Sequence, residues 1–333
     1  MTDAPPLALS MGDPAGVGPE LAIAAWSRRH DEALPAFVVI GSHAVIAAAG
    51  LRVSVPVAAV SSPAEAVALF DTALPVIDIG VGSYTPGQPD DAGAVLALTS
   101  LTLATTLTRE GKTSGLVTGP IAKSRLARVG FDYPGQTESV AAACGVAPDQ
   151  AVMMLAGPHL RVVPITVHVP LSQVPGLLTT RLIVSRAAIA AQGLSRDFGV
   201  VRPRLAVAGL NPHAGEDGRM GSEDRDVIAP AIAQLREAGF DTTGPLPADT
   251  MFHAAARATY DLAIGMYHDQ VLIPIKVLDF DEGVNVTLGL PIVRTSPDHG
   301  TAFGIAGTGT ARAGATIAAL RMAGLCARRR AHG

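Results

Sequence analysis

Three histidines stand at or after the ends of β-type runs and could together hold a divalent ion. His168 ends one run, His213 lies in a turn after another and His268 closely follows a third, at separations of 45 and 55 residues. Three imidazoles with an open fourth position suit a catalytic metal that polarises a hydroxyl or carbonyl oxygen. No short-range ligand motif such as His-x-x-x-His supports the metal, so the spacing alone favours three unrelated loop histidines.

A second candidate set, Lys276, Asn285 and Arg294, suits the binding of an anion. Each of these residues has apolar neighbours in the sequence that would hold it near a buried wall. A phosphate or carboxylate fits such a set, because arginine offers a bidentate fork and lysine a point charge. Each cation taken alone could equally pair with a nearby aspartate such as Asp279 or Asp298.

The hydrophobic pattern indicates the scaffold that would bring these distant side chains together. Short β-type runs alternate with Ala-rich helical stretches almost from end to end, which predicts an α/β fold with a parallel or mixed sheet covered on both faces. Ligands bind at the carboxyl ends of the strands in such sheets, so the polar loops after the strands are expected to form the site. Strands are expected at 7–11, 36–40, 53–57, 76–79, 115–118, 151–155, 161–167, 204–208, 261–265 and 284–288, and helices at 19–29, 93–109, 136–143, 181–192, 222–238 and 310–327.

The domain organisation has to come from topology, because no repeat, low-complexity tract or flexible linker divides the 333 residues. A chain of this length is enough for roughly two domains. We expect residues 1–117 and 201–333 to form a first α/β domain and residues 118–200 a second. The active site is expected in the cleft between them.

Composition and charge exclude several classes of protein. The chain has 25 Lys+Arg against 29 Asp+Glu and only 4% aromatic residues, whereas nucleic-acid binding needs a basic footprint and stacking platforms. No apolar run reaches the ~18 residues of a membrane span, and the first residues lack the pattern of a signal peptide. Cys144 and Cys326 lie far apart, which suits a reducing compartment. We therefore expect a cytoplasmic protein that acts on a small molecule and binds neither nucleic acid nor membrane.

The glycine-rich run at residues 16–20 does not match a dinucleotide fingerprint. Gly16 and Gly18 come shortly after a strand and before a helix, but the third glycine of Gly-x-Gly-x-x-Gly is missing. A tight structural turn is therefore the favoured interpretation. A nicotinamide cofactor, if one binds, would have to bind in another way.

Motifs rich in Gly, Pro and polar residues follow one another along the chain. They lie at residues 12–20 (GDPAGVGPE), 118–121 (TGPI), 209–216 (GLNPHAGE), 244–250 (GPLPADT), 267–270 (YHDQ), 274–276 (PIK), 283–291 (GVNVTLGLP) and 294–302 (RTSPDHGTA). In this order they resemble the 4-hydroxythreonine-4-phosphate dehydrogenase (PdxA) family of pyridoxal phosphate biosynthesis. The resemblance runs over nearly the whole chain, and several long motifs in order are highly specific.

This resemblance implies a homodimer with a shared active site, NAD as cofactor and a divalent metal (Zn, Mg or Co). The implied metal ligands, one of them supplied by the other subunit, are His168, His213 and His268. The implied substrate-binding residues are Thr137, Lys276, Asn285 and Arg294. The implied cofactor-binding loop, similar to one in isopropylmalate and isocitrate dehydrogenases, includes His299, Gly300, Thr301 and Ala302. The fold is expected to be similar to that of the same two dehydrogenases.

One departure from the family pattern concerns the substrate. Members usually read Gly-His-Thr-Glu where this chain reads Gly135-Gln136-Thr137-Glu138. Gln136, which takes the place of a substrate-contacting imidazole, can donate a hydrogen bond but cannot become cationic. The identity of the anionic substrate therefore depends on what Gln136 contacts.

The reaction that the resemblance implies is oxidation of 4-phosphooxy-L-threonine and its decarboxylation to 3-amino-2-oxopropyl phosphate. The candidates for the proton acceptor are Asp249, Asp269 and Lys276, although Asp269 could instead orient His268. One alternative is a related dehydrogenase that acts on another phosphorylated hydroxy acid or on a cis-dihydrodiol dicarboxylate. Another is an α/β module that binds a metal or an anion without turnover.

Overall fold

The computed structural model describes residues 4–332, which form two compact units. Unit 1 runs to Pro148 and resumes over Leu290–Arg328, while unit 2 comprises Asp149–Gly289 and the end of the chain from Arg329. This division differs from the predicted one at both seams. Residues 118–148 stay in unit 1. Residues 201–289 join unit 2, because their strands hydrogen-bond to strands at Val152–Ala156 and Arg161–Thr166 and to one another.

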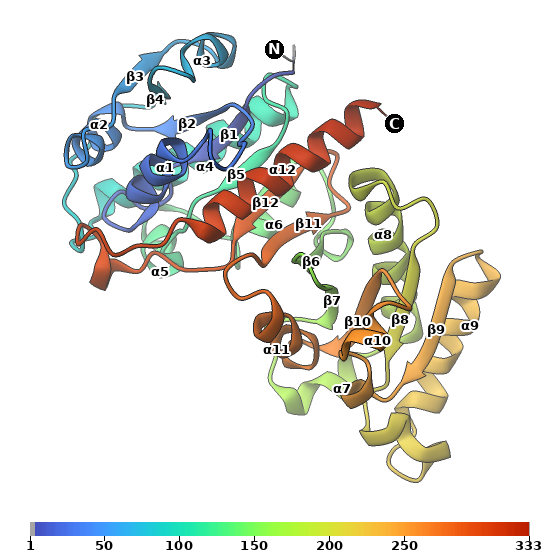
Figure 1. The fold of residues 1–333 in the computed structure, drawn as a ribbon. Helices are drawn as coiled ribbons and strands as arrows, with labels where there is room; N and C mark the ends of the chain where they lie inside the picture. The colour runs from blue at the N-terminus through green and yellow to red at the C-terminus, as the bar shows by residue number, and fades with distance from the viewer. Residues whose placement is uncertain (1–3, 333) are drawn as a thin grey trace. The chain divides into compact units, whose positions relative to one another are not determined.

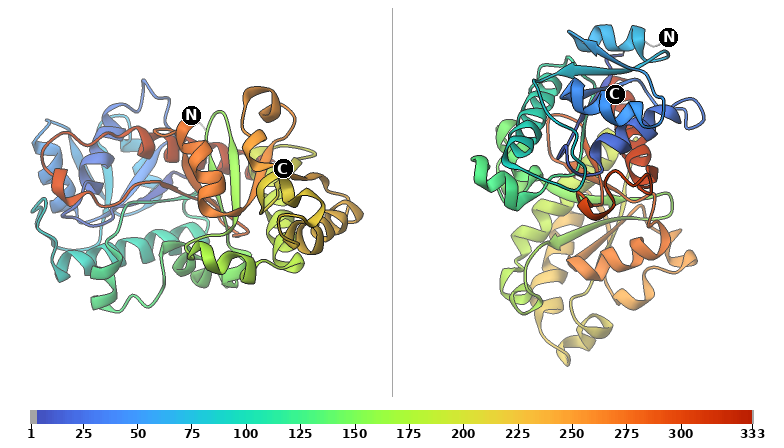
Figure 2. Two further views of the ribbon diagram at one scale, coloured as in Figure 1. Left: turned by 90° about the horizontal axis from the view of Figure 1, so that it is seen from below. Right: turned by 90° about the vertical axis from the view of Figure 1, so that its left-hand side faces the viewer.

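The sheet of unit 1 is parallel throughout, with the strand order β3-β4-β2-β1-β5-β12 (Figure 1). Its strands are β1 (Leu7–Ser10), β2 (Phe37–Gly41), β3 (Val57–Val60), β4 (Leu74–Asp78), β5 (Leu116–Thr118) and β12 (Arg294–Pro297). Its helices are α1 (Gly18–Ser27), α2 (His43–Leu51), α3 (Pro63–Leu69), α4 (Asp91–Arg109), α5 (Lys123–Leu126), α6 (Gln136–Ala143) and most of α12 (Gly314–His332), whose residues from Arg329 on belong to unit 2. Figure 2 shows α4 on one face of the sheet and α1 and α12 on the other, as a sheet buried on both sides requires.

The sheet of unit 2 is mixed, with the strand order β11-β6-β7-β10-β8-β9. The strands from β7 to β9 are parallel, whereas β6 runs antiparallel to both β7 and β11. The strands are β6 (Val152–Ala156), β7 (Arg161–Thr166), β8 (Arg204–Ala208), β9 (Asp241–Leu246), β10 (Leu262–Tyr267) and β11 (Val284–Leu288). The helices are α7 (Val174–Leu177), α8 (Thr180–Phe198), α9 (Ala229–Glu237), α10 (Ala254–Arg257) and α11 (His268–Leu278).

Short helical turns complete the chain. They are η1 (Ala127–Val129), η2 (Pro148–Gln150), η3 (Leu171–Gln173), η4 (Pro212–Gly218), η5 (Asp224–Ile228), η6 (Ala248–Thr250) and η7 (Phe303–Ile305). The predicted α/β class with a parallel or mixed sheet is confirmed.

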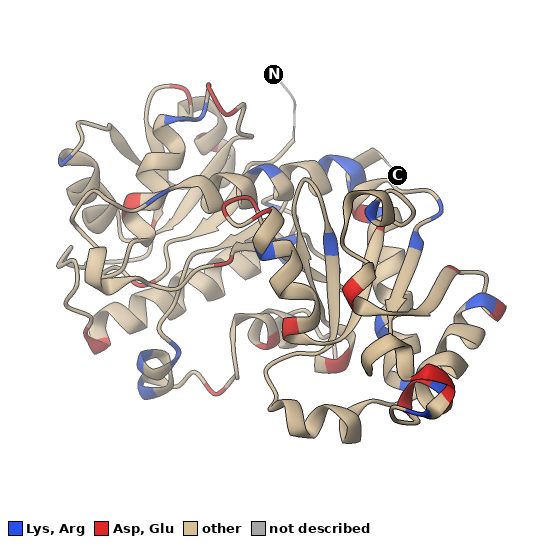
Figure 3. Cartoon of the chain, turned by 60° about the horizontal axis from the view of Figure 1, so that its bottom comes forward, with Lys and Arg blue, Asp and Glu red and all other residues tan. Residues whose placement is uncertain are grey.

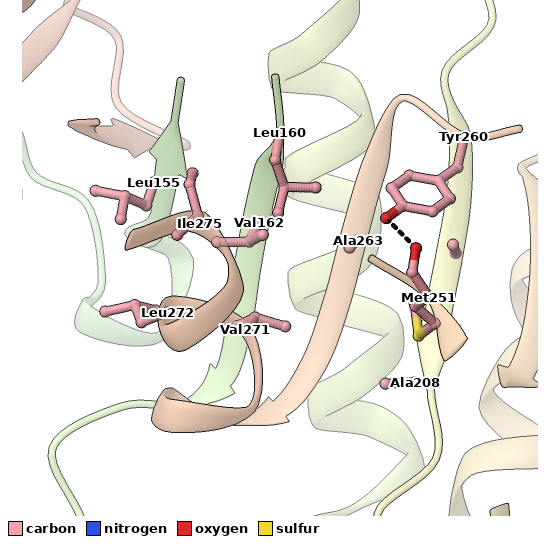
Figure 4. Close-up of a cluster of buried hydrophobic side chains, with 11 residues drawn as sticks. Leu155, Leu160, Val162, Ala208, Met251, Tyr260, Ala263, Val271, Leu272 and Ile275 are labelled. Atoms are coloured by element: carbon pink, nitrogen blue, oxygen red, sulfur yellow. Dashed lines mark hydrogen bonds between the residues drawn. The ribbon is translucent and has the colours of Figure 1, made fainter. Parts of the chain in front are cut away.

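Helix α11 forms although Pro274 lies inside it. A proline in a helix interior costs about 3 kcal/mol, but Val271, Leu272 and Ile275 are buried against β7 and β10, in the cluster of Figure 4. Each such side chain contributes about 1.5–3 kcal/mol when it is fully buried. Packing therefore outweighs the proline, and the helix places His268 at its first residue.

Several elements differ from the predictions, and three of these differences have a clear physical cause. The expected strand at 53–57 instead begins at Val57, because Val53 and Val55 donate backbone hydrogen bonds to Gly50 in a turn. Strand β9 was not expected, since it contains the turn-forming pair Gly244-Pro245, but β9 is an edge strand that tolerates proline. Strand β12 has the polar sequence RTSP and looked like a loop, yet all four of its residues are buried.

One described helix, α4, is long and apolar enough by composition to cross a membrane. In its most apolar window, however, 56% of the residues are buried inside the structure. The helix packs against β1 and β2, so its apolar face is accounted for by the core of unit 1.

Candidate active site

The cation of unit 1, Arg294, occupies the first position of strand β12. β12 pairs with β5 so that Arg294 lies opposite Leu116. Thr118, two residues further along β5, therefore faces the same side of the sheet. The Arg294 guanidinium donates from Nη2 to Thr118 Oγ1 (2.8 Å) and from Nη1 to Thr137 Oγ1 (3.1 Å).

Arg294 is a buried charge, with only 3% of its surface exposed. Burial lowers the pKa of its guanidinium to about 10, and the negative charge of Glu138 only partly opposes this. Its two threonine partners are neutral. A guanidinium that contacts neutral hydroxyls could also bind an anionic group.

Helix α6 adds backbone donors beside this cation. The helix begins after Gly135, which has no side chain to cap it, and Thr137 lies in the first turn. The N–H groups of a first turn have no partner within the helix and attract negative charge. Arg294, Thr137 and the start of α6 thus form one candidate anion-binding region, which we call the anion site.

Gln136 is held in a defined orientation at the same helix end. Its Nε2 donates to the backbone oxygen of Gly119 (3.1 Å), while Oε1 is buried without a hydrogen-bond partner among the described residues. The amide thus presents an acceptor, where a protonated histidine would present a donor.

Further buried polar atoms lie on the loops that follow β1 and β12 and in the first turn of α1. Within residues 4–332, Asp13 Oδ2, Glu20 Oε2 and His299 Nε2 are buried without hydrogen-bond partners. Burial raises the pKa of Asp13. Unsatisfied buried polar atoms are rare in native proteins, so several on neighbouring loops fit a polar ligand such as a dinucleotide.

The loop with the predicted cofactor residues contacts the glycine-rich loop. Val17 donates its backbone N–H to Thr301 O (3.0 Å), and a Cβ on Gly16 would lie 2.8 Å from the same oxygen. Glu20 Oε1 accepts from Tyr84 Oη (2.7 Å) and from the backbone N–H of Gly307. The tight turn predicted at residues 16–20 thus also supports the loop at residues 299–307, which contains Gly300 and Ala302.

In unit 2, the three histidines follow the carboxyl ends of three neighbouring parallel strands. His168 comes shortly after β7, His268 directly after β10 and His213 after β8, and these strands pair in the order β7-β10-β8. The rings of His168 and His268 are 5.7 Å apart between centroids. Both line a cavity of about 250 Å³, together with Asp269 and Leu171.

His213 lies in a strained loop. Residues 213–217 all have left-handed backbone angles, with φ of 53° at His213 and 53° at Ala214. Such angles cost roughly 1–2 kcal/mol per non-glycine residue. The buried Asp224 carboxylate supports the loop by accepting from the backbone N–H groups of Leu210 (2.8 Å) and Asn211 (3.1 Å).

Two of the histidines have a carboxylate on Nδ1. The distance from His213 Nδ1 to Glu216 Oε1 is 2.6 Å, and that from His268 Nδ1 to Asp269 Oδ1 is 2.7 Å. Metal-ligating histidines commonly use one ring nitrogen in this way, which leaves Nε2 for the ion. The donor chemistry therefore fits a divalent metal, but residues 4–332 of one chain contain no group of three ligands close enough to hold an ion.

The charge around His213 affects any metal that it binds. The hydrogen bond and charge of Glu216 raise the pKa of His213, and the charge of Asp249, on η6, adds to this. A metal must compete with the proton for the imidazole, so metal affinity is expected to fall as the pH is lowered.

The remaining predicted residues lie elsewhere in unit 2. Lys276 is near the end of α11, with Nζ 5.5 Å from the Phe280 ring centroid. Asn285 is on β11 and has a buried Oδ1 without a hydrogen-bond partner among the described residues. The structure thus gathers Gln136, Thr137 and Arg294 in unit 1.

Sequence reasoning did not assign a role to Thr118 or to Glu216. Thr118 stands in the motif TGPI, but its importance depends on a strand pairing with residues far along the chain. Glu216, three residues after His213, could have been found from that spacing.

Several known proteins are similar to this chain. A family model described as pyridoxal phosphate biosynthetic protein PdxA matches residues 33–323. A 4-hydroxythreonine-4-phosphate dehydrogenase of Erythrobacter litoralis is 60% identical over 328 residues, which cover 98% of each chain. The crystal structure of a 4-hydroxythreonine-4-phosphate dehydrogenase from Klebsiella pneumoniae has a TM-score of 0.88 at 36% identity, covering 98% of this chain and 99% of the other.

A more distant solved structure belongs to a dehydrogenase with a different named substrate. It is a terephthalate 1,2-cis-dihydrodiol dehydrogenase from Burkholderia xenovorans, with a TM-score of 0.67 at 27% identity, covering 96% of this chain and 97% of the other. The family match and the 60% identity extend over most of the sequence. This chain therefore belongs to the PdxA family of pyridoxal phosphate biosynthetic proteins.

Proposed function

We propose that this chain oxidises and decarboxylates 4-phosphooxy-L-threonine to 3-amino-2-oxopropyl phosphate, with NAD and a divalent metal, as a step in pyridoxal phosphate biosynthesis. Its relatives at 60% and 36% identity are named 4-hydroxythreonine-4-phosphate dehydrogenases. The observation that carries the proposal is the anion site, where the buried guanidinium of Arg294 lies beside the first turn of α6. A phosphate ester matches both the charge and these donors.

In this reaction NAD accepts the hydride from C3 of the substrate, and the hydroxyl proton goes to a base. The resulting 3-oxo acid loses CO₂, and a proton then enters at the carbon that carried the carboxylate. A metal held by His168, His213 and His268 would lower the pKa of the hydroxyl and stabilise the charge that develops on the same oxygen. Gln136, Thr137, Lys276, Asn285 and Arg294 would bind the substrate.

Three residues are proposed for proton transfer: Asp249, Asp269 and Lys276. Asp269 contacts His268 Nδ1, which favours an orienting role for it. Asp249 is close enough to His213 for its charge to raise the pKa of that imidazole. Lys276, as a cation, would also attract the substrate. His299, Gly300, Thr301 and Ala302 are proposed to contact NAD, where the buried Nε2 of His299 is a fitting hydrogen-bonding atom.

We propose that the active form is a homodimer with a shared site. Ile273, Val277 and Phe280 are 60%, 79% and 66% exposed, and their spacing places them on one side of α11 and its end. Leu171, which lines the histidine cavity, is also exposed. A second copy that covers this apolar surface could supply the third histidine ligand that one chain does not bring within reach. A cytoplasmic location is part of the same proposal.

A second candidate substrate is a cis-dihydrodiol dicarboxylate. The neutral Gln136, with its acceptor Oε1, favours it, as does the fold shared with a terephthalate dihydrodiol dehydrogenase. Measuring NADH formation with 4-phosphooxy-threonine, its unphosphorylated analogue and the dihydrodiol dicarboxylate separates the candidates. We expect turnover only of the phosphorylated compound. Equal rates with the unphosphorylated analogue would remove the phosphate from the proposal, and metal binding without any NADH formation would favour a binding module.

The metal role is tested with His213→Ala. This side chain is exposed, so the variant should fold normally while it loses NADH formation and the metal content measured by mass spectrometry. Exhaustive chelation of the unaltered protein should abolish activity in the same way. Full activity of the variant would show that His213 is not a ligand.

A further inference from the structure

Thr118 contributes to the anion site through a contact that links distant parts of unit 1. It is the last residue of β5, only 1% of its surface is exposed, and its Oγ1 accepts from Nη2 of Arg294 at 2.8 Å. Thr137, on α6, accepts from the other arm, Nη1, at 3.1 Å. Two hydroxyls from two separate elements thus hold both arms of one guanidinium.

We propose that Thr118 is a positioning residue for the substrate's anionic group, because its hydroxyl, with that of Thr137, fixes the direction in which Arg294 presents its charge. The inference rests on the proposed role of Arg294 in binding the phosphate. It assigns to Thr118 a role in affinity and in selection of a charged substrate, rather than in the chemical step.

The first argument is geometric. An arginine side chain has several freely rotating bonds, and holding it in one arrangement costs up to about 2 kcal/mol of rotamer entropy. Thr118 is β-branched and lies in a strand, so its own χ1 is restricted. A hydroxyl on such a side chain is a fixed acceptor, and it holds Nη2 in place before the ligand arrives.

The second argument is electrostatic. A carboxylate at either threonine position would fix the guanidinium equally well, but would neutralise its charge. Hydroxyl acceptors orient Arg294 without adding a negative charge beside it. Each hydroxyl that accepts from Arg294 also keeps its own hydrogen, so Thr137, in the first turn of α6, can donate that hydrogen to the bound anion.

The test compares Thr118→Val, which keeps the shape but removes the hydroxyl, with Thr118→Ser, which restores it. Thr105→Val is the matched control, because Thr105 is also buried in unit 1 and its hydroxyl donates only locally, to Leu101 O on α4. For each protein, three quantities are measured: the dissociation constant of inorganic phosphate by calorimetry, and KM and kcat with 4-phosphooxy-threonine. Thermal unfolding of each variant verifies that it is folded.

We expect Thr118→Val to raise the dissociation constant of phosphate and KM about 10-fold, the effect of one lost hydrogen bond to a charged group. Its kcat should change less than threefold, Thr118→Ser should be close to the unaltered protein, and Thr105→Val should affect neither constant. If Thr118→Val does not fold, Thr118→Ser and Thr118→Ala provide the comparison. Phosphate affinity should then be lost only in Thr118→Ala.

The experiment distinguishes failure of the proposed function from failure of the inference about Thr118. If the unaltered protein binds phosphate but does not oxidise 4-phosphooxy-threonine, the proposed function fails, while a loss of phosphate affinity in Thr118→Val still supports the inference. If the unaltered protein is active and Thr118→Val has the same phosphate affinity and KM, the inference about Thr118 is overturned and the proposed function stands. A protein that neither binds phosphate nor turns over the substrate contradicts both.

Discussion

Arg294 in unit 1 and Asp197 in unit 2 are both buried charged residues, but different kinds of group contact them. Arg294 in unit 1 is 3% exposed and contacts threonine hydroxyls. Asp197 in unit 2 is 2% exposed and accepts bidentate hydrogen bonds from Arg330 (2.6 and 2.9 Å) and from Arg196 (2.7 and 3.1 Å). Figure 3 shows that acidic and basic residues are otherwise scattered along the chain.

The pKa shifts express this difference. Burial dominates at Arg294 and lowers its pKa to about 10, toward the neutral form. Burial also raises the pKa of Asp197, but the hydrogen bonds from Arg330 and Arg196 outweigh it and bring the pKa below its usual value. Asp197 is therefore kept ionised by two guanidinium groups, whereas burial shifts Arg294 toward its neutral form, and an anionic ligand would favour its charged form.

The largest effect is expected from Arg294→Met, which removes the buried positive charge. Activity with 4-phosphooxy-threonine (kcat/KM) should fall about 10²–10³-fold, since a charged contact in a buried site is worth about 3–5 kcal/mol when one partner is removed. The free energy of unfolding should change little, because the variant also loses the cost of burying the charge. Steady-state kinetics and urea unfolding measure the two quantities.

Arg294→Lys serves as the control for charge. A lysine keeps the positive charge but cannot bridge the hydroxyls of Thr118 and Thr137, so most of the loss should persist. Normal kcat/KM in Arg294→Met would refute the contrast with Asp197.

Asp197→Asn should show the opposite behaviour. It leaves the partly buried Arg330 without its counter-charge, and we expect the free energy of unfolding to fall by about 3 kcal/mol, with kcat/KM nearly unchanged. Urea unfolding of the variant provides the measurement. A stable variant with impaired catalysis would mean that Asp197 belongs to the active site.

The pH dependence of stability further tests the comparison between Asp197 and Arg294. The folded-state pKa of Asp197 lies below the unfolded value of 3.8, so its carboxylate contributes stability above about pH 4 that is lost as the pH falls through the folded-state pKa. Unfolding free energies measured on acidification below about pH 4 should fall less steeply in Asp197→Asn than in the unaltered protein. Parallel curves would show that this ion pair has no part in acid stability.

The smallest effect is expected from Ala214→Gly, in the strained loop of His213. Ala214 has φ of 53°, an angle that glycine adopts without the steric penalty of a Cβ. We expect the variant to be about 1 kcal/mol more stable in thermal unfolding. Lower stability would mean that the packing of the Ala214 methyl group outweighs the backbone strain.

Much of the scaffold was predictable from local pattern. Most of the expected strands and all six expected helices are present, and helix α6 has the predicted bounds, because apolar periodicity reflects local backbone geometry. Helix α11 and strand β12 were missed, since Pro274 argues against a helix and the sequence RTSP against a buried strand. In both, tertiary packing overrides local preference.

The candidate site, like the scaffold, was predictable from the sequence only in part. The family resemblance implied that Thr137, Lys276, Asn285 and Arg294 bind the substrate, with Gln136 in place of a substrate-contacting imidazole. The structure brings Gln136, Thr137 and Arg294 to one end of the unit 1 sheet, while Lys276 and Asn285 lie in unit 2. It also places His168 and His268 on one cavity. The carboxylates on His213 and His268 and the hydroxyl of Thr118 could not be weighed from the sequence alone, because their contacts depend on side-chain positions.

By itself, the sequence determined the α/β class, the family and the residue types available for chemistry, since periodicity and motifs are carried by neighbouring residues. The tertiary structure decided which charges are buried and what they contact. Thr118 meets Arg294 across 176 residues of chain only because β12 pairs with β5 in one register. Such a register is set by the packing of the whole sheet, which no local stretch of sequence encodes.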